Sequence, residues 1–408
     1  MKFSHLADCH IGSWREPKLR DISIKAFNKA IDLSIENKVD FILISGDLFN
    51  TSMPAIDKLK ETVIKLKELK DKEIPVYAIA GSHDYSPSGK TMLDVLDSAG
   101  LLYNVVKGEI ILGNLSLRFT IDKKTGAKIT GLLGRRKALE RYDYEHLLKD
   151  QLEKEEGYKI FMFHSALTEA MPKNLEAIYS LPLSFIPKGF DYYAGGHVHI
   201  VFSEYIQDYG LVSYPGPLFP NSFKELEDLG CGGFYIVEEN KPQWHKIQIL
   251  NTFSISIDCN NKSAQDITRE LMEIIANKEF YNTIVTIRLF GCLSSGNLVD
   301  IDMQSIIKQL YDKSAYFVMK NTHGLTTKKF EEIKLEISST KEIEEELIKR
   351  YLGKMKLNGF DELKEETFIK SLIDALNKEK DEGERLADFE NRVREEINKI
   401  MGIYPTMP

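Results

Sequence analysis

The chain has 408 residues, of which 43% are hydrophobic and 28% charged, as in ordinary globular proteins. A chain of this length is expected to form two or three domains, each with its own hydrophobic core. Its formal net charge of −8 excludes a protein coated in positive charge. Any contact with nucleic acid is therefore expected to be local.

Cysteine usage and hydropathy indicate the compartment. The four cysteines stand singly along the chain, without a CxxC pair for zinc or a dense disulfide framework. The N-terminal residues MKFSHLADCH contain an Asp and two His before any apolar run, and no apolar stretch is long enough to span a bilayer. We expect a protein of the reducing cytoplasm with no membrane association.

The first predicted strand covers residues 2–7 and ends at Asp8-Cys9-His10. Because side chains alternate along an extended backbone, Asp8 and His10 are expected on one side and Cys9 on the other. His5 is expected to be a hydrogen-bonded core residue. A helix with an apolar stripe is predicted over 21–37.

The run FILI at 41–44 lacks alternation, which indicates a strand buried on both faces, and it is followed by Gly46-Asp47. A helix over 55–70 and a strand over 75–80 follow, and this strand ends at Gly81-Ser82-His83-Asp84. Each of the first three strands therefore ends in polar side chains. In open α/β sheets this edge is where ligands bind.

Two more strands end in histidine. After a predicted helix over 91–99 and a β-rich region, the strand 159–163 is followed by His164. The strand 190–194 is followed by Gly-Gly-His197-Val-His199, whose spacing places both imidazoles on one side of an extended segment. Hairpin strands complete this part of the chain near residue 250.

The remaining chain predicts two further parts. Strands and helices alternate from 252 to 320 as in a small α/β domain, with no polar cluster at the strand ends. Beyond about residue 340 the chain is rich in Glu, Lys, Leu and Ile at helical spacing. This helical segment either folds back on the body or docks on another protein. We expect domains at 1–250, 251–335 and 336–408.

The polar strand ends together predict a metal centre. Carboxylates and imidazoles without a thiolate suit manganese, iron, zinc or magnesium and argue against a structural zinc site. There are enough donors for two ions, and a shared carboxylate can bridge such a pair. Asp47, on the most buried strand, is the expected bridge. The collected set is Asp8, His10, Asp47, Ser82, His83, His164, His197 and His199.

The order D-x-H, GD, G-x-HD, H, G-H-x-H at strand ends resembles the calcineurin-like metallophosphoesterase superfamily. The segments HLADCHIG, GDLF, GRRK at 134–137 and YPGPLFPNSF at 214–223 resemble one branch, the double-strand-break repair nucleases known as SbcD in bacteria and meiotic recombination eleven in archaea and eukaryotes. The resemblance implies a layered α/β core of two sheets flanked by helices, a small α/β cap that binds DNA, and a C-terminal helical extension.

The resemblance also implies an activity and a site. The activity is a manganese-dependent DNA nuclease, a single-strand endonuclease and a 3′–5′ double-strand exonuclease, working with two Mn²⁺ per chain, for which Mg²⁺ or another divalent ion could substitute. One metal would be held by Asp8, His10, Asp47 and His199, and the other by Asp47, Ser82, His164 and His197. His83 would contact the scissile phosphate and help to protonate the leaving oxygen.

Two positions depart from the family pattern. Ser82 stands where the superfamily usually has Asn, and a hydroxyl is shorter and a poorer donor to a metal, so weaker binding of the second ion is expected. Asn50 stands where relatives have His or Asp; it can orient His83 but cannot stabilise its charged form. Exonuclease efficiency is therefore in question. The alternatives are a weakly active or non-catalytic DNA-binding scaffold and a small-substrate phosphodiesterase or phosphatase.

Partners follow from the same resemblance. They are DNA ends and hairpins, a second copy of the chain, and an SMC-like ABC-type ATPase of the SbcC type, in a nucleoid-associated complex. Three adjacent cations, Arg135, Arg136 and Lys137, are either an ordinary solvated patch or a site that contacts phosphates without reading sequence. Their place on an acidic chain favours phosphate contact. Met92, Val95 and Leu96 are candidate dimer anchors, with ordinary core residues as the equal alternative. Candidate residues for docking the ATPase are Ile343, Leu347, Tyr351, Phe389, Val393 and Ile397.

Overall fold

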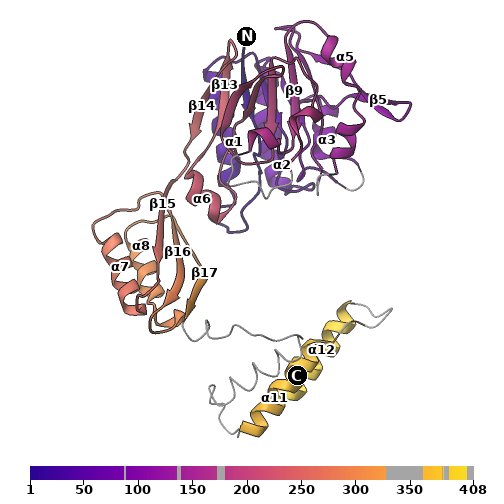
Figure 1. Cartoon of the computed structure of the whole chain (residues 1–408). Helices are drawn as coiled ribbons and strands as arrows, with labels where there is room; N and C mark the ends of the chain where they lie inside the picture. Colours follow the sequence, from indigo (N-terminus) through magenta and orange to yellow (C-terminus); the bar gives the residue numbers. More distant parts are fainter. Residues whose placement is uncertain are drawn as a thin grey trace. The chain divides into compact units, whose positions relative to one another are not determined.

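The computed structural model describes residues 1–86, 89–135, 139–171, 180–327, 362–378, 380 and 386–401. The chain forms two compact units, Met1–Thr327 and Lys328–Pro408 (Figure 1). Among the described residues, no helix combines the length and the apolar character needed to cross a bilayer.

The first sheet of the N-terminal unit has six strands in the order β14-β13-β1-β2-β3-β4. Strands β1 to β4 run parallel, whereas β13 is antiparallel to both β1 and β14. The carboxyl ends of β1, β2 and β3 therefore meet at one edge. The bounds are β1 (Lys2–Leu6), β2 (Phe41–Ser45), β3 (Val76–Ile79), β4 (Tyr103–Asn104), β13 (Gly232–Glu238) and β14 (Lys241–Ile247).

The second sheet has the order β11-β12-β10-β9-β8-β7. Its inner strands β12, β10, β9 and β8 run parallel, and antiparallel strands flank them. A separate hairpin, β5 (Gly108–Ile111) and β6 (Asn114–Leu117), precedes it. The bounds are β7 (Thr120–Ile121), β8 (Lys128–Gly131), β9 (Lys159–His164), β10 (Tyr192–Gly196), β11 (Phe202–Ile206) and β12 (Gly210–Tyr214).

The two sheets face each other across a common core. Phe41 and Leu43 of β2 pack in this core with Ile160 and Met162 of β9. The alternate β2 residues, Ile42 and Ile44, instead pack on the opposite face of the first sheet, in a second core. Because both faces of β2 are buried, its sequence shows an unbroken apolar run rather than alternation.

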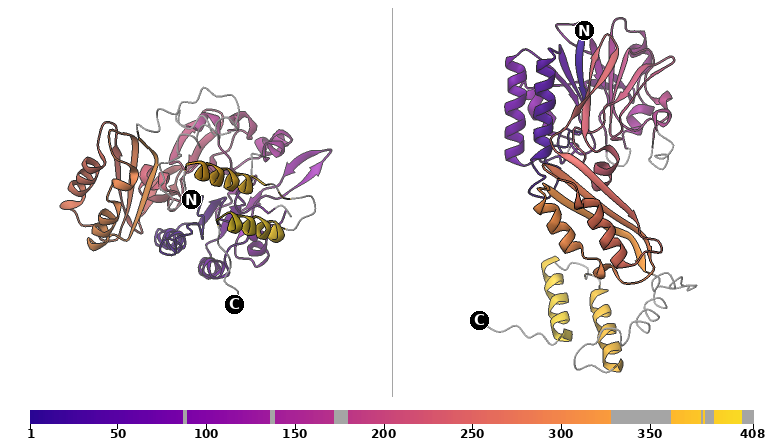
Figure 2. Two further views of the ribbon diagram at one scale, coloured as in Figure 1. Left: turned by 90° about the horizontal axis from the view of Figure 1, so that it is seen from below. Right: turned by 90° about the vertical axis from the view of Figure 1, so that its left-hand side faces the viewer.

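Helices cover the outer faces of both sheets. Helices α1 (Ile22–Glu36), α2 (Ile56–Asp71) and α3 (Met92–Ser98) contribute buried residues to the core on the first sheet, and α1 and α2 lie side by side there (Figure 2). Helices α4 (Arg141–Glu145) and α5 (Lys149–Lys154) pack on the second sheet. The layered α/β metallophosphoesterase fold is therefore confirmed. Further helices of this part are η2 (Thr168–Ala170), η4 (Leu183–Phe185) and α6 (Phe223–Leu229).

Residues 251–327 form a three-stranded parallel sheet and the helices that pack on it. This part has its own hydrophobic core and belongs to the N-terminal unit. The last strand extends to Thr327, seven residues beyond the predicted end, because its pairing with β16 resumes after an irregularity at Arg288/Phe290. The domain limits at 250/251 and 335/336 stay predictions. The elements are β15 (Asn251–Asp258), α7 (Ala264–Ala276), β16 (Thr283–Leu293), η5 (Leu298–Asp300), α8 (Met303–Asp312) and β17 (Phe317–Thr327).

The described part of the second unit is a pair of helices, α11 (Glu362–Leu376) and α12 (Leu386–Met401). Lys378 forms an ion pair with Glu396 of α12 at 2.6 Å, and Ala375 of α11 is buried. The α12 residues expected to dock a partner, Phe389, Val393 and Ile397, are half-buried. The other three, Ile343, Leu347 and Tyr351, lie outside the described residues.

The three candidate dimer residues of α3 differ in environment. Leu96 is 2% exposed and belongs to the core against the first sheet, whereas Val95 is 58% exposed and Met92 is half-buried against that core. Leu96 therefore packs within the core of its own chain. Of the three, Val95 is the one that presents its side chain at the surface.

Replacing Leu96 by Ala should lower the free energy of unfolding by about 2–5 kcal/mol, because a buried leucine leaves a cavity when truncated. Val95→Ala, one residue away on the exposed face, should change it by less than about 1 kcal/mol. Urea unfolding of both variants at several protein concentrations measures this. Equal losses for the two variants would contradict the placement of Leu96 in the core.

Candidate metal centre

The loops that follow β1, β2 and β10 are joined by main-chain hydrogen bonds. The Asp8 N–H donates to the Gly46 carbonyl (3.1 Å), and the His10 N–H donates to the Asp47 carbonyl (2.9 Å). The Asp8 carboxylate accepts the His197 N–H, with its two oxygens at 3.0 and 3.1 Å. Residues from three strand ends are thereby brought to one place, as the strand-end pattern predicted.

Five of the predicted ligand residues have a left-handed backbone. Their φ angles are 49° at Asp8, 42° at His10, 51° at Asp47, 93° at His197 and 46° at His199. Residues other than glycine adopt such angles only where the surrounding structure holds them. The backbone here departs from the extended geometry assumed from the sequence, so it is these turns that direct the side chains inward.

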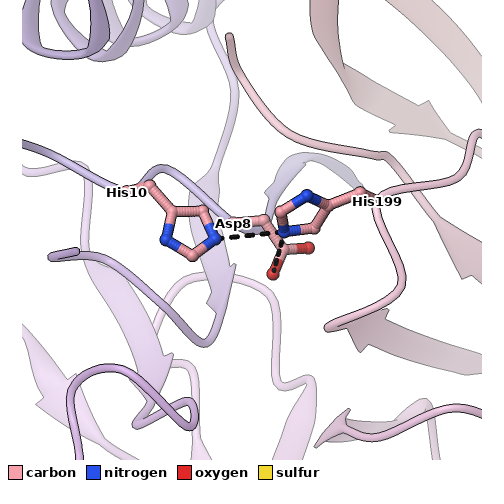
Figure 3. A group of neighbouring side chains, drawn as sticks. All are labelled: Asp8, His10 and His199. Carbon is pink, nitrogen blue, oxygen red and sulfur yellow. Dashed lines mark hydrogen bonds and ion pairs between the residues drawn. The ribbon is translucent and has the colours of Figure 1, made fainter. Parts of the chain in front are cut away.

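The first cluster consists of Asp8, His10 and His199 (Figure 3). The Nε2 atoms of His10 and His199 lie 3.0 Å apart, and His199 Nε2 lies 3.6 Å from Asp8 Oδ1. His199 Nδ1 lies 3.2 Å from a carboxylate oxygen of Glu225. Two imidazole nitrogens and a carboxylate oxygen therefore converge on a common point.

The second cluster joins Asp8, Asp47 and His164. His164 Nε2 lies 3.2 Å from Asp47 Oδ2 and 4.0 Å from Asp8 Oδ1. Its Nδ1 must carry the proton, because it bonds the carbonyl of Ser45 at 2.8 Å. His197 stands next to it, with the two ring centroids 5.2 Å apart.

These groups fit a divalent cation. His10 Nδ1 and His164 Nε2 are buried, and among the described residues neither has a hydrogen-bond partner. In its neutral form, His164 would direct an Nε2 lone pair at the Asp47 carboxylate, and the two repel unless a proton or a cation lies between them. Carboxylate and imidazole donors of this kind bind Mn²⁺, Fe²⁺ or Zn²⁺.

Burial and charge act in opposite directions on the pKa values of these groups. Burial lowers the pKa of His10 to about 3 and that of His197 to about 4, so both are in the neutral, ligating form at neutral pH. For His164, burial also lowers the pKa, but the charge of Asp47 outweighs it and raises the value to about 10. Burial opposes ionisation of Asp47, yet His164 holds its pKa well below the ordinary value.

Glycines surround the His164 ring because no side chain fits there. A Cβ on Gly46 would lie 2.2 Å from His164 Nδ1, and one on Gly134 would lie 2.5 Å from its Cδ2. A Cβ on Gly196 would lie 2.1 Å from the Ser45 carbonyl oxygen. Gly46 additionally has a φ of 89°. The glycines of the GD and GGH segments thus make room for this histidine.

His83 completes a third cluster with His10 and Asp47. The main-chain N–H of His83 donates to Asp47 Oδ1 at 2.8 Å. The ring Nδ1–H of His83 donates to Asn50 at 2.8 Å. The acceptor is the main-chain carbonyl of Asn50, not the side-chain amide that we expected to orient the ring. Ser82 is 9% exposed at the end of β3.

The predicted basic patch is described only in part. Arg135 forms an ion pair with Asp143 (3.0 Å) and lies over the ring of Tyr85, 5.8 Å from its centroid. Its side chain is 33% exposed. Arg136 and Lys137 lie outside the described residues.

Two acidic residues of the centre were missed by the sequence analysis. Asp84 accepts three main-chain N–H groups, from Gly81 and Leu48 at 3.1 Å and from Phe49 at 2.9 Å, and so ties the loop after β3 to the loop after β2. Glu225 bonds His199 from α6. The sequence contains a pattern at each position. Asp84 is the last residue of the GSHD segment, and Ser222 with Glu225 matches a helix-capping pattern.

The chain is similar in sequence to several known proteins. The family model described as calcineurin-like phosphoesterase matches residues 1–201. The DNA double-strand break repair protein Mre11 of Archaeoglobus fulgidus is 27% identical over 324 residues, which are 74% of this chain and 70% of that protein. The protein of the same name from Methanococcus maripaludis is 30% identical over 64% of this chain and 68% of its own length. That of Sulfolobus acidocaldarius is 25% identical over 99% of both chains.

His5 contributes to the pH dependence of the free energy of unfolding. It is buried, its Nδ1 lies 2.9 Å from the Tyr192 hydroxyl, and burial lowers its pKa to about 3. Between pH 6.5 and about 3 the unfolded chain binds a proton at this position that the folded chain does not. The free energy of unfolding should therefore fall as pH falls through this window, by up to about 1.4 kcal/mol per pH unit from His5.

In His5→Gln this part of the slope should be absent. Urea unfolding between pH 6.5 and 4.5 in the presence of a chelator measures it. His323→Gln serves as the control, because His323 is exposed and its loss should leave the slope unchanged. A His5→Gln slope equal to that of the unmodified protein would contradict the prediction.

Proposed function

The chain belongs to the family of the DNA double-strand break repair protein Mre11, and we propose that it is a manganese-dependent DNA nuclease. In this proposal it cuts single strands internally and degrades duplex ends from 3′ to 5′. It is supported by the family match over residues 1–201 and by relatives that align over most of the chain.

The observation that carries the proposal is that carboxylates are shared between clusters. Asp8 belongs to one cluster with His199 and to another with His164, and Asp47 joins the His164 cluster to the His83 cluster. Shared carboxylates are the usual bridges of two-metal centres that hydrolyse phosphodiesters. In the proposed assignment one metal takes Asp8, His10, Asp47 and His199, and the second takes Asp47, Ser82, His164 and His197.

When bound, the two ions would supply Lewis acidity toward the phosphoryl oxygens. The chain's own contribution to proton transfer would come from His83. Its Nδ1–H is held by the Asn50 carbonyl, so Nε2 is the ring nitrogen that can take or give a proton at the leaving oxygen. In this proposal the neutral Asn50 carbonyl orients the ring but does not bring the negative charge that a carboxylate partner would.

The test is cleavage of a blunt linear duplex and of circular single-stranded DNA with Mn²⁺. The unmodified protein should cut both DNA substrates. His83→Ser should lower the rate by about 10²–10⁴-fold, the usual size of a general acid–base contribution. Ser82→Asn should raise the rate at limiting Mn²⁺, because the side chain of Asn is longer than that of Ser and its amide oxygen is a better metal ligand. His146→Ser, a histidine outside these clusters, is the matched control.

Each other result points to a different activity. If neither DNA is cut, even with Ser82→Asn, the chain is a DNA-binding scaffold. If DNA is left intact but a small phosphoester is hydrolysed, the chain is a small-substrate phosphodiesterase or phosphatase. Undiminished cutting by His83→Ser would remove His83 from the mechanism.

We further propose that DNA phosphates are bound by the segment that contains Arg135. Arg135→Gln should weaken binding of a blunt duplex and reduce the salt dependence of the binding constant by about one unit of log–log slope, as expected for one phosphate contact. Arg118→Gln is the control, since Arg118, directly after β6, is ion-paired and its side chain is 67% exposed. Fluorescence anisotropy in EDTA, which prevents cleavage, measures both. Equal effects would contradict a specific role for Arg135.

The proposed assembly is a homodimer with an SMC-like ABC-type ATPase, acting on DNA ends and hairpins. The exposed Val95 of α3 supports a role of this helix in the dimer. The row of Phe389, Val393 and Ile397 along α12 supports a docking role for the C-terminal unit. In this proposal residues 251–335 are the DNA-binding cap and residues 336–408 the docking extension.

A further inference from the structure

The seven-residue helix α6 (Phe223–Leu229) connects two parts of the N-terminal unit. It follows β12 and precedes the last two strands of the first sheet, and it contacts β15 and β16 (Figure 1). Leu226 is fully buried in the core against the first sheet. The carbonyl of Gly230, which ends the helix, accepts the hydroxyl of Thr252 of β15 at 2.7 Å. The helix is therefore fixed both to the core on the first sheet and to the small α/β part that contains β15.

At its first turn, α6 contacts the metal cluster through Glu225. One carboxylate oxygen lies 3.2 Å from His199 Nδ1 and accepts the Asn221 N–H at 2.9 Å. The other accepts the Ser222 hydroxyl at 3.2 Å. A carboxylate beside Nδ1 keeps the proton on that nitrogen and leaves Nε2 as the ligating atom. His199 Nε2 is the atom that faces Asp8 and His10.

This arrangement differs from that of the other two oriented histidines. His164 and His83 donate their Nδ1–H to main-chain carbonyls, of Ser45 and Asn50. Those carbonyls belong to β2 and the loop after it, within the sheet. The partner of His199 instead is a charged side chain on a short helix, and its position depends on where that helix lies.

Two residues further on, Glu227 binds the small α/β part. Its carboxylate accepts Arg288 Nε at 3.0 Å with both oxygens and Arg288 Nη2 at 2.5 Å. Arg288 is on β16, and its guanidinium also lies over the ring of Phe223, 5.1 Å from the centroid. Bidentate arginine–carboxylate pairs impose a defined geometry as well as an attraction. The three-stranded sheet thus holds α6 by a rigid contact.

We infer that α6 couples the α/β part at 251–327 to the metal cluster, with Glu225 as the positioning residue for His199 and the Glu227–Arg288 pair as the link to β16. The inference rests on the proposed function, since it concerns the same divalent metal. Displacing β16 moves Arg288, hence α6, hence the carboxylate that orients His199. Metal binding at this cluster and the position of the α/β part then depend on each other.

The test is a titration of the full chain with Mn²⁺. Binding is measured by calorimetry and by the electron paramagnetic resonance signal of free Mn²⁺. Glu225→Ala should weaken one class of Mn²⁺ site by about 10–100-fold, the usual effect of removing such a partner, and leave the other class unchanged. Glu225→Gln, which keeps an oxygen acceptor without the charge, should lie between. Asp228→Asn is the control on the same helix, because Asp228 pairs with Lys224 at the surface.

A double-mutant cycle tests the coupling. Arg288→Ala should lower Mn²⁺ affinity by at least about twofold when Glu225 is present and have no effect in Glu225→Ala, as expected for residues of one network. If Glu225→Ala does not fold, the same cycle with Glu225→Gln decides the matter, because Gln keeps an oxygen acceptor for the capping contacts.

The outcomes are separable. Mn²⁺ binding by Glu225→Ala and Glu225→Gln equal to that of the unmodified chain overturns the positioning role while leaving the proposed function intact. Equal effects of Arg288→Ala with and without Glu225 overturn the coupling. Absence of Mn²⁺ binding by the unmodified chain overturns both this inference and the proposed metal-dependent nuclease.

Discussion

The N-terminal unit depends on how two buried carboxylates, Asp8 and Asp47, are accommodated; they are 1% and 2% exposed. Burying an ionised carboxylate is costly unless donors or cations compensate. Main-chain N–H groups of His197 and His83 supply part of the compensation. The Asp47 carboxylate is further stabilised by His164, which is on the second sheet. The two sheets must therefore be aligned at their carboxyl edges for either carboxylate to be tolerated.

Much of this could be predicted from the sequence, because strand ends and metal donors coincide. The apolar run at 41–44 predicted a strand buried on both faces, and its two faces do pack in different cores. The parallel order of β1, β2 and β3 then brings Asp8, Asp47 and His83 to one edge without further information. His5 was interpreted as a hydrogen-bonded core residue, and it is fully buried.

What could not be predicted depends on backbone angles and on distant contacts. An alternation argument assumes an extended chain, whereas Asp8, His10 and His199 all have φ near +45°. The partner of His83 is a carbonyl, which has no sequence signature. Leu96 and Val95 are adjacent apolar residues of one helix, and only the packing of α3 on the first sheet shows which one is buried. Glu225 is distant in sequence from His199, and a capping pattern does not indicate what else the carboxylate contacts.

The position of β1 has a consequence for folding during synthesis. β1 lies between β2 and β13, and Ser4 is paired with Ile236. A ribosome that has made the first half of the chain has therefore produced β1, the strand that precedes Asp8 and His10, without its antiparallel neighbour β13. That edge of β1 stays open to other strands until more than half of the chain has emerged. The N-terminal unit thus has high contact order, and completing the sheet is expected to be a slow, late step.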